Sequence, residues 1–141
     1  MECIDHIELH DSVVQISTEA DELLLELRPA YVHHWTRVAG SWHGRGGTQI
    51  AVIRLSEGRV VPNPPLLPTE IADGWIRIGE ESYDNLIPVP LSRVGAIKVH
   101  LELVNADPID LSGSAIVVEL AGPFKDIEEL PADWAPVRGA V

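Results

Sequence analysis

The stretch that decides the fold is residues 96–104, Ala-Ile-Lys-Val-His-Leu-Glu-Leu-Val, in which apolar and polar side chains alternate almost without interruption. Successive side chains of a β-strand point to opposite faces, so this alternation is typical of a strand with one buried face. The buried face is predicted to carry Ile97, Val99, Leu101 and Leu103. The outer face is predicted to carry Lys98, His100 and Glu102.

The same period of two recurs on both sides of this stretch. Downstream, a turn at residues 105–108 leads to an antiparallel return over residues 109–120. Upstream, residues 22–28 place three leucines on one face and form a hairpin with the extended segment before them. The chain contains about nine such segments, separated by turn residues. This pattern predicts an all-β fold, an antiparallel two-sheet sandwich or jelly-roll-like arrangement with at most one or two short helical turns.

Three segments are predicted to depart from the strand pattern. Residues 36–47 are rich in Gly, Ser, His and Arg, which predicts a loop. Thr69 is a candidate N-cap for one helical turn over residues 70–72. The end of the chain contains two prolines and a glycine. We therefore expect a single β domain over residues 1–130 and a loosely ordered C-terminal tail over residues 131–141.

Charge narrows the range of partners. The chain carries 22 acidic and 10 basic residues, a net charge of −12. An acidic surface repels phosphate backbones and anionic lipids, and the basic residues are scattered, so we expect neither a nucleic-acid nor a membrane partner. The charge instead favours a basic protein partner or a divalent cation.

The chain is expected to be cytoplasmic. It begins Met-Glu-Cys-Ile-Asp, without the basic and apolar regions of a secretory signal. Its only cysteine, Cys3, has no intrachain partner for a disulfide, which agrees with a reducing compartment. No uncharged apolar run approaches the roughly 20 residues that a membrane span requires.

The predicted loop and the strand before it carry an aromatic and histidine-rich cluster. Exposed Trp, Tyr and His side chains are typical anchors of protein interfaces, and they also stack on sugar rings. The candidate binding residues are Tyr31, His33, Trp35, Arg37, Trp42, His43 and Arg45. The competing interpretation is that each tryptophan packs in the core.

Six histidines suggest a second hypothesis, a divalent metal site. Strand residues two apart lie about 6.6 Å from each other and residues four apart about 13 Å, so one ion can take Glu8 with either His6 or His10 but hardly with both. A third ligand would come from a neighbouring strand. The candidate ligands are Glu8, His10, His33, His43 and His100. The competing interpretation is that these histidines are solvated on strand faces.

Two short motifs are unsuited to catalysis. The consecutive residues His10, Asp11 and Ser12 cannot form a hydrolytic relay, because the members of a triad meet through the fold. Asp11 and Ser12 are better explained as a turn. Residues 44–47, Gly-Arg-Gly-Gly, lack the Lys-Ser/Thr ending of a phosphate loop and precede a strand instead of a helix.

Five short sequence segments are similar to segments of other proteins. They are His-Asp-Ser at 10–12, Ala-Tyr-Val-His at 30–33, Thr-Gln-Ile-Ala at 48–51, Asp-Gly at 73–74 and Asn-Leu-Ile-Pro at 85–88. With these pieces the chain resembles a family of small uncharacterised bacterial all-β proteins that have an N-terminal His-Asp-Ser hairpin. The resemblance covers most of the chain and implies a shared all-β fold. It brings no known activity with it.

Two classes of function follow from these observations. The first is a non-catalytic binding protein, such as an immunity or adaptor protein, that uses its acidic surface and Trp/His-rich loop to bind a protein partner and needs no cofactor. The second is a metal-dependent, cupin-like enzyme with His and Glu ligands on neighbouring strands. A sugar-binding module built on Trp35 and Trp42 is a weaker third alternative. The lack of a catalytic signature favours the binding protein.

Overall fold

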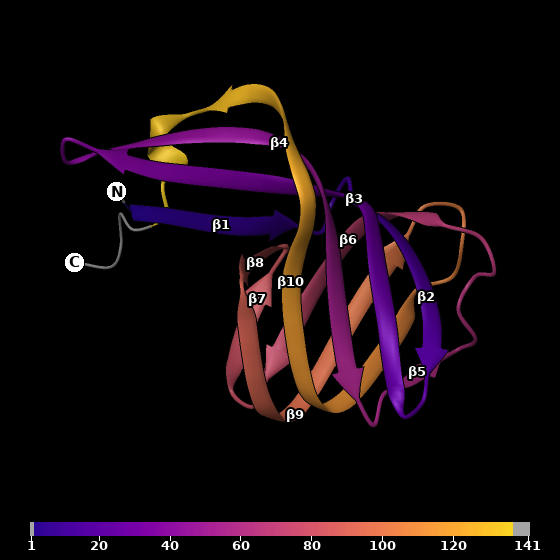
Figure 1. The fold of residues 1–141 in the computed structure, drawn as a ribbon. Coiled ribbons are helices and arrows are strands. Elements are labelled where there is room, and N and C mark those ends of the chain that lie inside the picture. The colour runs from indigo at the N-terminus through magenta and orange to yellow at the C-terminus, as the bar shows by residue number, and fades with distance from the viewer. Residues whose placement is uncertain (1, 137–141) are drawn as a thin grey trace.

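The computed structural model describes residues 2–136, which are almost entirely β-strand (Figure 1). Within these residues the strands and the single 3₁₀ turn are β1 (Glu2–Glu8), β2 (Val13–Glu19), β3 (Glu22–Val38), β4 (Ser41–Ser56), β5 (Arg59–Val61), β6 (Thr69–Ile78), β7 (Glu81–Asp84), β8 (Leu86–Val89), β9 (Leu91–Leu103), β10 (Ile109–Leu130) and η1 (Ala132–Trp134). All of the strand pairings are antiparallel. The predicted all-β class is confirmed. Residues 2–136 contain no helix with the length and apolar character needed to cross a membrane.

The strands form one continuous sheet that folds over on itself. Its order is β2-β6-β9-β10-β4-β3-β1-β8, with β5 on β10, β7 on β6 and an additional pairing of β2 with β3. The pairings among β2, β6, β9, β10, β4 and β3 therefore close into a circuit, which we call the body. In Figure 1, β3 and β4 run in front of β6 and β9. The two layers expected from the sequence are thus parts of a single sheet.

The core of the body is built from the apolar faces that the alternation predicted. On β9, Ile97, Val99 and Leu101 are each 1% exposed, which confirms the buried face of residues 96–104. The three leucines on one face of residues 22–28, Leu23, Leu25 and Leu27, are buried in the same cluster. The predicted hairpin of β2 with β3 and the antiparallel return of β10 along β9 are also confirmed.

The long strands β3 and β4 extend beyond the body and form a projecting arm (Figure 1). The arm comprises β1, residues 30–38 of β3, residues 41–49 of β4 and residues 124–130 of β10. Along β3 the pairing partner changes, because residues 22–27 pair with β2 and residues 31–37 pair with β1. The arm therefore places β1 beside the aromatic residues of β3.

The loop predicted over residues 36–47 is wrong. The chain reverses at Ala39 and Gly40, whose φ angles are 52° and 81°, and β4 pairs with β3 from Ser41 onward. These positive φ angles suit the tight turn of a two-residue hairpin. The segment is therefore the tip of the arm.

The glycines that suggested a loop instead make room for aromatic side chains. A Cβ atom at Gly44 would lie 2.6 Å from the Trp35 ring. A Cβ atom at Gly46 would lie 2.4 Å from the Tyr31 hydroxyl oxygen. Glycine inside a strand often marks such a close approach. Both aromatic side chains thus lie against the backbone of β4.

The helical turn expected over residues 70–72 is also wrong, because these residues belong to β6. Ile71 is 1% exposed and pairs with Leu103, so the strand conformation places an apolar side chain in the core.

Residues 131–136 include η1, whereas the rest of the predicted tail, residues 137–141, lies outside the described residues. The division of the chain at residue 130 stays a prediction.

Replacing Gly44 with alanine is expected to lower the free energy of unfolding by about 1–3 kcal/mol, the range typical of overpacking. The added methyl group would overlap the buried Trp35 ring. Urea denaturation followed by tryptophan fluorescence measures the change. Ser41→Ala, at an exposed position of the same hairpin, is the control and is expected to stay within about 0.5 kcal/mol of the native chain. Equal stabilities of the two variants would contradict this packing role.

Candidate metal centre

A tight turn after β1 is held by hydrogen bonds to two other parts of the chain. The His10 backbone N–H donates to the side-chain oxygen of Asn85 at 2.8 Å. The buried Ser12 hydroxyl donates to the carbonyl oxygen of Glu8 at 2.7 Å and accepts from the Tyr31 backbone N–H at 3.0 Å. The turn is therefore anchored to β3 and to the segment before β8.

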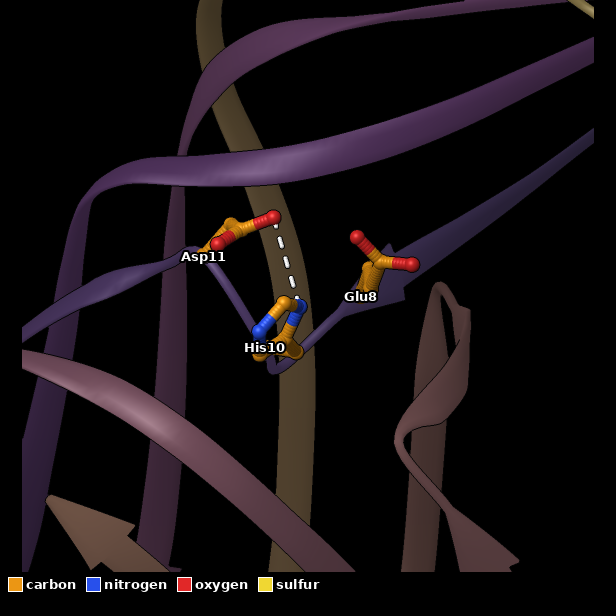
Figure 2. A group of neighbouring side chains, drawn as sticks. All are labelled: Glu8, His10 and Asp11. Carbon is orange, nitrogen blue, oxygen red and sulfur yellow. Dashed lines mark ion pairs between the residues drawn. The ribbon is translucent and has the colours of Figure 1, made fainter.

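Glu8, His10 and Asp11 gather at this turn (Figure 2). Each offers one ligand atom, a carboxylate oxygen or an imidazole nitrogen, and these atoms lie within 4.8 Å of one another. The Nδ1 atom of His10 lies 3.3 Å from a carboxylate oxygen of Asp11. Two ligand atoms bound at about 2.1 Å to one tetrahedral ion are about 3.4 Å apart. The spacing of this pair thus suits a shared metal ion.

His33, on the neighbouring strand β3, places a buried imidazole beside Glu8. Its Nε2 atom lies 3.6 Å from a carboxylate oxygen of Glu8, and its side chain is only 5% exposed. Within residues 2–136 this buried nitrogen has no hydrogen-bond partner. Leaving such an atom unpaired costs about 1–3 kcal/mol. A cation between Glu8 and His33 would satisfy the nitrogen, at a spacing close to that of two ligands on one ion.

The strand register explains why Glu8 and His33 meet. Glu8 pairs with Tyr31 and His6 pairs with His33, so Glu8 and His33 are diagonal neighbours on one face of the arm. His6 lies on the same face. Burial lowers the pKa of His6, and the charge of a protonated His33 lowers it further, against a smaller opposing effect of Asp5. This face therefore favours a neutral His6 next to the candidate ligands.

Two aromatic rings enclose the imidazole of His33. Trp134 of η1 stacks on it, with ring centroids 6.1 Å apart and an angle of 14° between the planes. Tyr31 meets it edge-on at a centroid distance of 5.8 Å. The Tyr31 hydroxyl donates to the Glu128 carboxylate, and burial together with this hydrogen bond raises the pKa of Tyr31 well above its usual value. The imidazole is thus held with Nε2 near Glu8.

A hollow of about 360 Å³ adjoins the group, and it is lined by Glu8, His33, Asn85, Leu86 and Trp134. The side chains of His10 and Asp11 are each 53% exposed. The group is therefore buried on the His33 side and open on the other. Catalytic zinc sites keep a position for water or substrate. With four protein ligands, an ion here would take such a molecule as a fifth ligand on the exposed side.

The predicted binding residues do not form one surface. One face of the arm carries Tyr31, His33, Trp35, Arg37 and Trp42. The opposite face carries His43 and Arg45. Trp35 is 1% exposed, so it is a packing residue and not an exposed anchor. Arg37 forms an ion pair with Glu2 at 3.2 Å, and Arg45 forms one with Asp126 at 2.9 Å. The expectation of a single exposed cluster is corrected accordingly.

Of the predicted metal ligands, the structure brings Glu8 and His10 into one group with Asp11, and it places His33 beside Glu8 but outside that group. The other two lie elsewhere. His43 is exposed and pairs with Thr36, so it faces away from His33 on the other side of the arm. His100 lies on β9, and its Nδ1 atom is 2.7 Å from an Asp110 carboxylate oxygen. The sequence alone does not determine on which face of the sheet each histidine lies, because this depends on the register between paired strands.

Four residues of the site are not among the ligand or lining candidates from the sequence, namely Asp11, Asn85, Leu86 and Trp134. Asp11 was assigned to a turn alone, although the turn is what brings its carboxylate next to His10. A Glu-x-His-Asp run that ends a strand is the signal that would have found it. Trp134 lies about one hundred residues from His33 in sequence, and no local pattern links the two.

Comparisons of this chain with protein-family models, with curated proteins and with solved structures found no significant match. No activity is therefore carried over from a relative, and the function has to be argued from the residues of the site.

Proposed function

We propose that this protein binds a divalent transition-metal ion through Glu8, His10, Asp11 and His33, and that it is a metal-dependent enzyme acting on a small substrate in the adjoining hollow. The observation that carries the proposal is the buried Nε2 atom of His33. It has no partner within residues 2–136 and lies 3.6 Å from Glu8. A metal ion is the ligand that satisfies a neutral imidazole nitrogen and a carboxylate together.

The donor set indicates the class of metal. Two imidazoles and two carboxylates suit Zn²⁺ and its first-row neighbours, whereas Ca²⁺ and Mg²⁺ prefer oxygen ligands alone. The only cysteine, Cys3, is exposed on β1 and lies on the face opposite Glu8, so the set contains no thiolate. Zinc is therefore the first metal to test.

The open side of the site indicates the kind of chemistry. A bound Zn²⁺ polarises a carbonyl or phosphoryl oxygen and lowers the pKa of a bound water to about 7. Held by Glu8, His10, Asp11 and His33, such an ion would supply this Lewis acid and this activated water for the hydrolysis of a bound substrate. The residues that line the hollow beyond the ligands, Asn85, Leu86 and Trp134, would contact the substrate. The proposed reaction class is hydrolysis of a small ester or amide.

Titration calorimetry of chelator-treated protein with Zn²⁺ tests the proposal. We expect one ion per chain, and we expect His33→Ala to weaken binding by roughly a hundredfold or more, because loss of an outer-shell partner alone already costs about tenfold to a hundredfold and here a direct ligand is lost. His43→Ala is the matched control, since this histidine is exposed on the other face of the arm. The proposal fails if the native chain binds no zinc or if the two variants bind it equally well.

A second candidate function is a non-catalytic binding protein, of the immunity or adaptor kind, for a basic protein partner. The observation that favours it is the edge of β10 on the arm, where residues 125–130 pair with β4 and with no other strand of residues 2–136. Asp126, Glu128 and Glu129 are exposed there, and Ile127 is 59% exposed. An unpaired edge accepts an added strand. Ile127→Lys would weaken such binding and leave zinc affinity unchanged, which separates the two candidates.

A further inference from the structure

Four strands bring three basic residues into one row on the outer face of the body. Arg77 of β6 pairs with Lys98 of β9, Lys98 pairs with Ser112 of β10, and Ser112 pairs with Arg59 of β5. All four side chains are exposed. The residues lie far apart in the sequence, and only the register of the sheet aligns them.

The charge of this row has no ion-pair partner within residues 2–136, and its one aromatic contact is that of Arg77, whose guanidinium lies 4.7 Å from the Trp75 ring centroid. Like charges directly opposite each other on a sheet are destabilising, and Arg77 and Lys98 are such a pair. Among the ion pairs within residues 2–136, none involves Arg59, Arg77 or Lys98. Three of the chain's 10 basic residues thus gather in a protein of net charge −12 without an acidic partner in salt-bridge contact.

A second row of side chains lies next to the basic row on the same four strands, and its first and last residues are apolar. It runs from Trp75 through His100 and Asp110 to Val61, which is 67% exposed. The one carboxylate of this row, Asp110, is 2.7 Å from Nδ1 of His100. The imidazole of His100 in turn stacks on Trp75 at a centroid distance of 5.5 Å. The acidic group near the basic row is therefore engaged by a histidine.

A hollow of about 430 Å³ lies over both rows. Its lining includes the three cations, together with Trp75 and Val61. This volume falls within the roughly 300–1,000 Å³ typical of small-molecule sites. The carboxylate of Asp110 also lines the hollow. The hollow therefore combines three cations and one carboxylate with an apolar side.

We propose that this hollow binds a small organic anion, whose phosphate, sulfonate or carboxylate group lies against Arg59, Arg77 and Lys98 and whose apolar part lies against Trp75 and Val61. Arginine and lysine donate charge-assisted hydrogen bonds to such oxyanions. The site shares no residue with the proposed metal centre and goes beyond the proposed function.

Fluorescence titration with anilinonaphthalene sulfonate, an aromatic sulfonate, tests the proposal in the presence of EDTA. We expect the native chain to bind the probe, and the double variant Arg77→Gln/Lys98→Gln to bind it roughly tenfold or more weakly. The matched control is Arg54→Gln/Lys125→Gln, which removes the same charge outside the hollow and is expected to bind the probe as the native chain does.

The uncharged analogue N-phenylnaphthylamine separates an anion site from a merely apolar surface. We expect it to bind weakly and to respond equally to both double variants. The proposal is overturned if the native chain does not bind the sulfonate, if the two double variants lose affinity equally, or if the uncharged analogue binds as tightly as the sulfonate. Thermal unfolding of each variant verifies that it is folded.

Discussion

Replacing Trp35 with alanine is expected to lower the free energy of unfolding by about 3–5 kcal/mol, the range for truncation of a buried tryptophan. Trp35 is 1% exposed, and its ring lies over Gly44 of β4. In the sheet, Trp35 also pairs with Ile4 of β1. The side chain thus contributes to the packing of three strands of the arm. Because Gly44 has no side chain that can move into the space, truncation leaves a cavity. Urea denaturation measures the loss.

Trp42→Ala is the matched control for this prediction. Trp42 lies on the same face of the arm, but it is only partly buried, and the Arg37 guanidinium lies 6.0 Å from its ring centroid. We expect it to lose less than half as much stability as Trp35→Ala. Equal losses would mean that the arm is stabilised by its aromatic content in general, and not by the packing of Trp35 on Gly44.

The strands were predictable because their signal is local. Ile97, Val99 and Leu101 alternate with polar residues, and one buried face requires no more than this period of two. The hairpin of β2 with β3 follows from a short turn between two such segments. Each of these features is encoded within about ten to twenty residues, which is the range that pattern reasoning covers.

The arm and the candidate site were less predictable because they depend on register between distant strands. Gly44 and Gly46 look like loop residues until Trp35 and Tyr31 are placed over them. His33 was recognised as a candidate ligand, yet its approach to Glu8 follows from pairing across more than twenty residues. The basic row on the body has the same origin, since scattered cations become neighbours only after the sheet has formed.

Zinc is expected to stabilise the native chain by about 4 kcal/mol when its free concentration is a thousandfold above the dissociation constant. This gain follows because the ion binds the folded arrangement of Glu8, His10, Asp11 and His33 and the unfolded chain lacks that arrangement. His33→Leu is expected to remove most of the gain, since leucine fills a similar space without a ligand atom. Urea denaturation with zinc and with EDTA measures both quantities.

In the metal-free chain, His33→Leu is expected to leave the free energy of unfolding unchanged or to raise it. His33→Leu removes a buried nitrogen that has no partner within residues 2–136, so the variant in EDTA should be as stable as the native chain or more stable by about 1 kcal/mol. His43→Leu, on the exposed opposite face, should keep the full gain from zinc. A reversal of the stability order between EDTA and zinc is specific to a metal ligand, because loss of ordinary packing would destabilise the variant equally in both conditions. If zinc stabilises the native chain and His33→Leu by the same amount, His33 is a packing residue, and the proposal that it is a metal ligand is overturned.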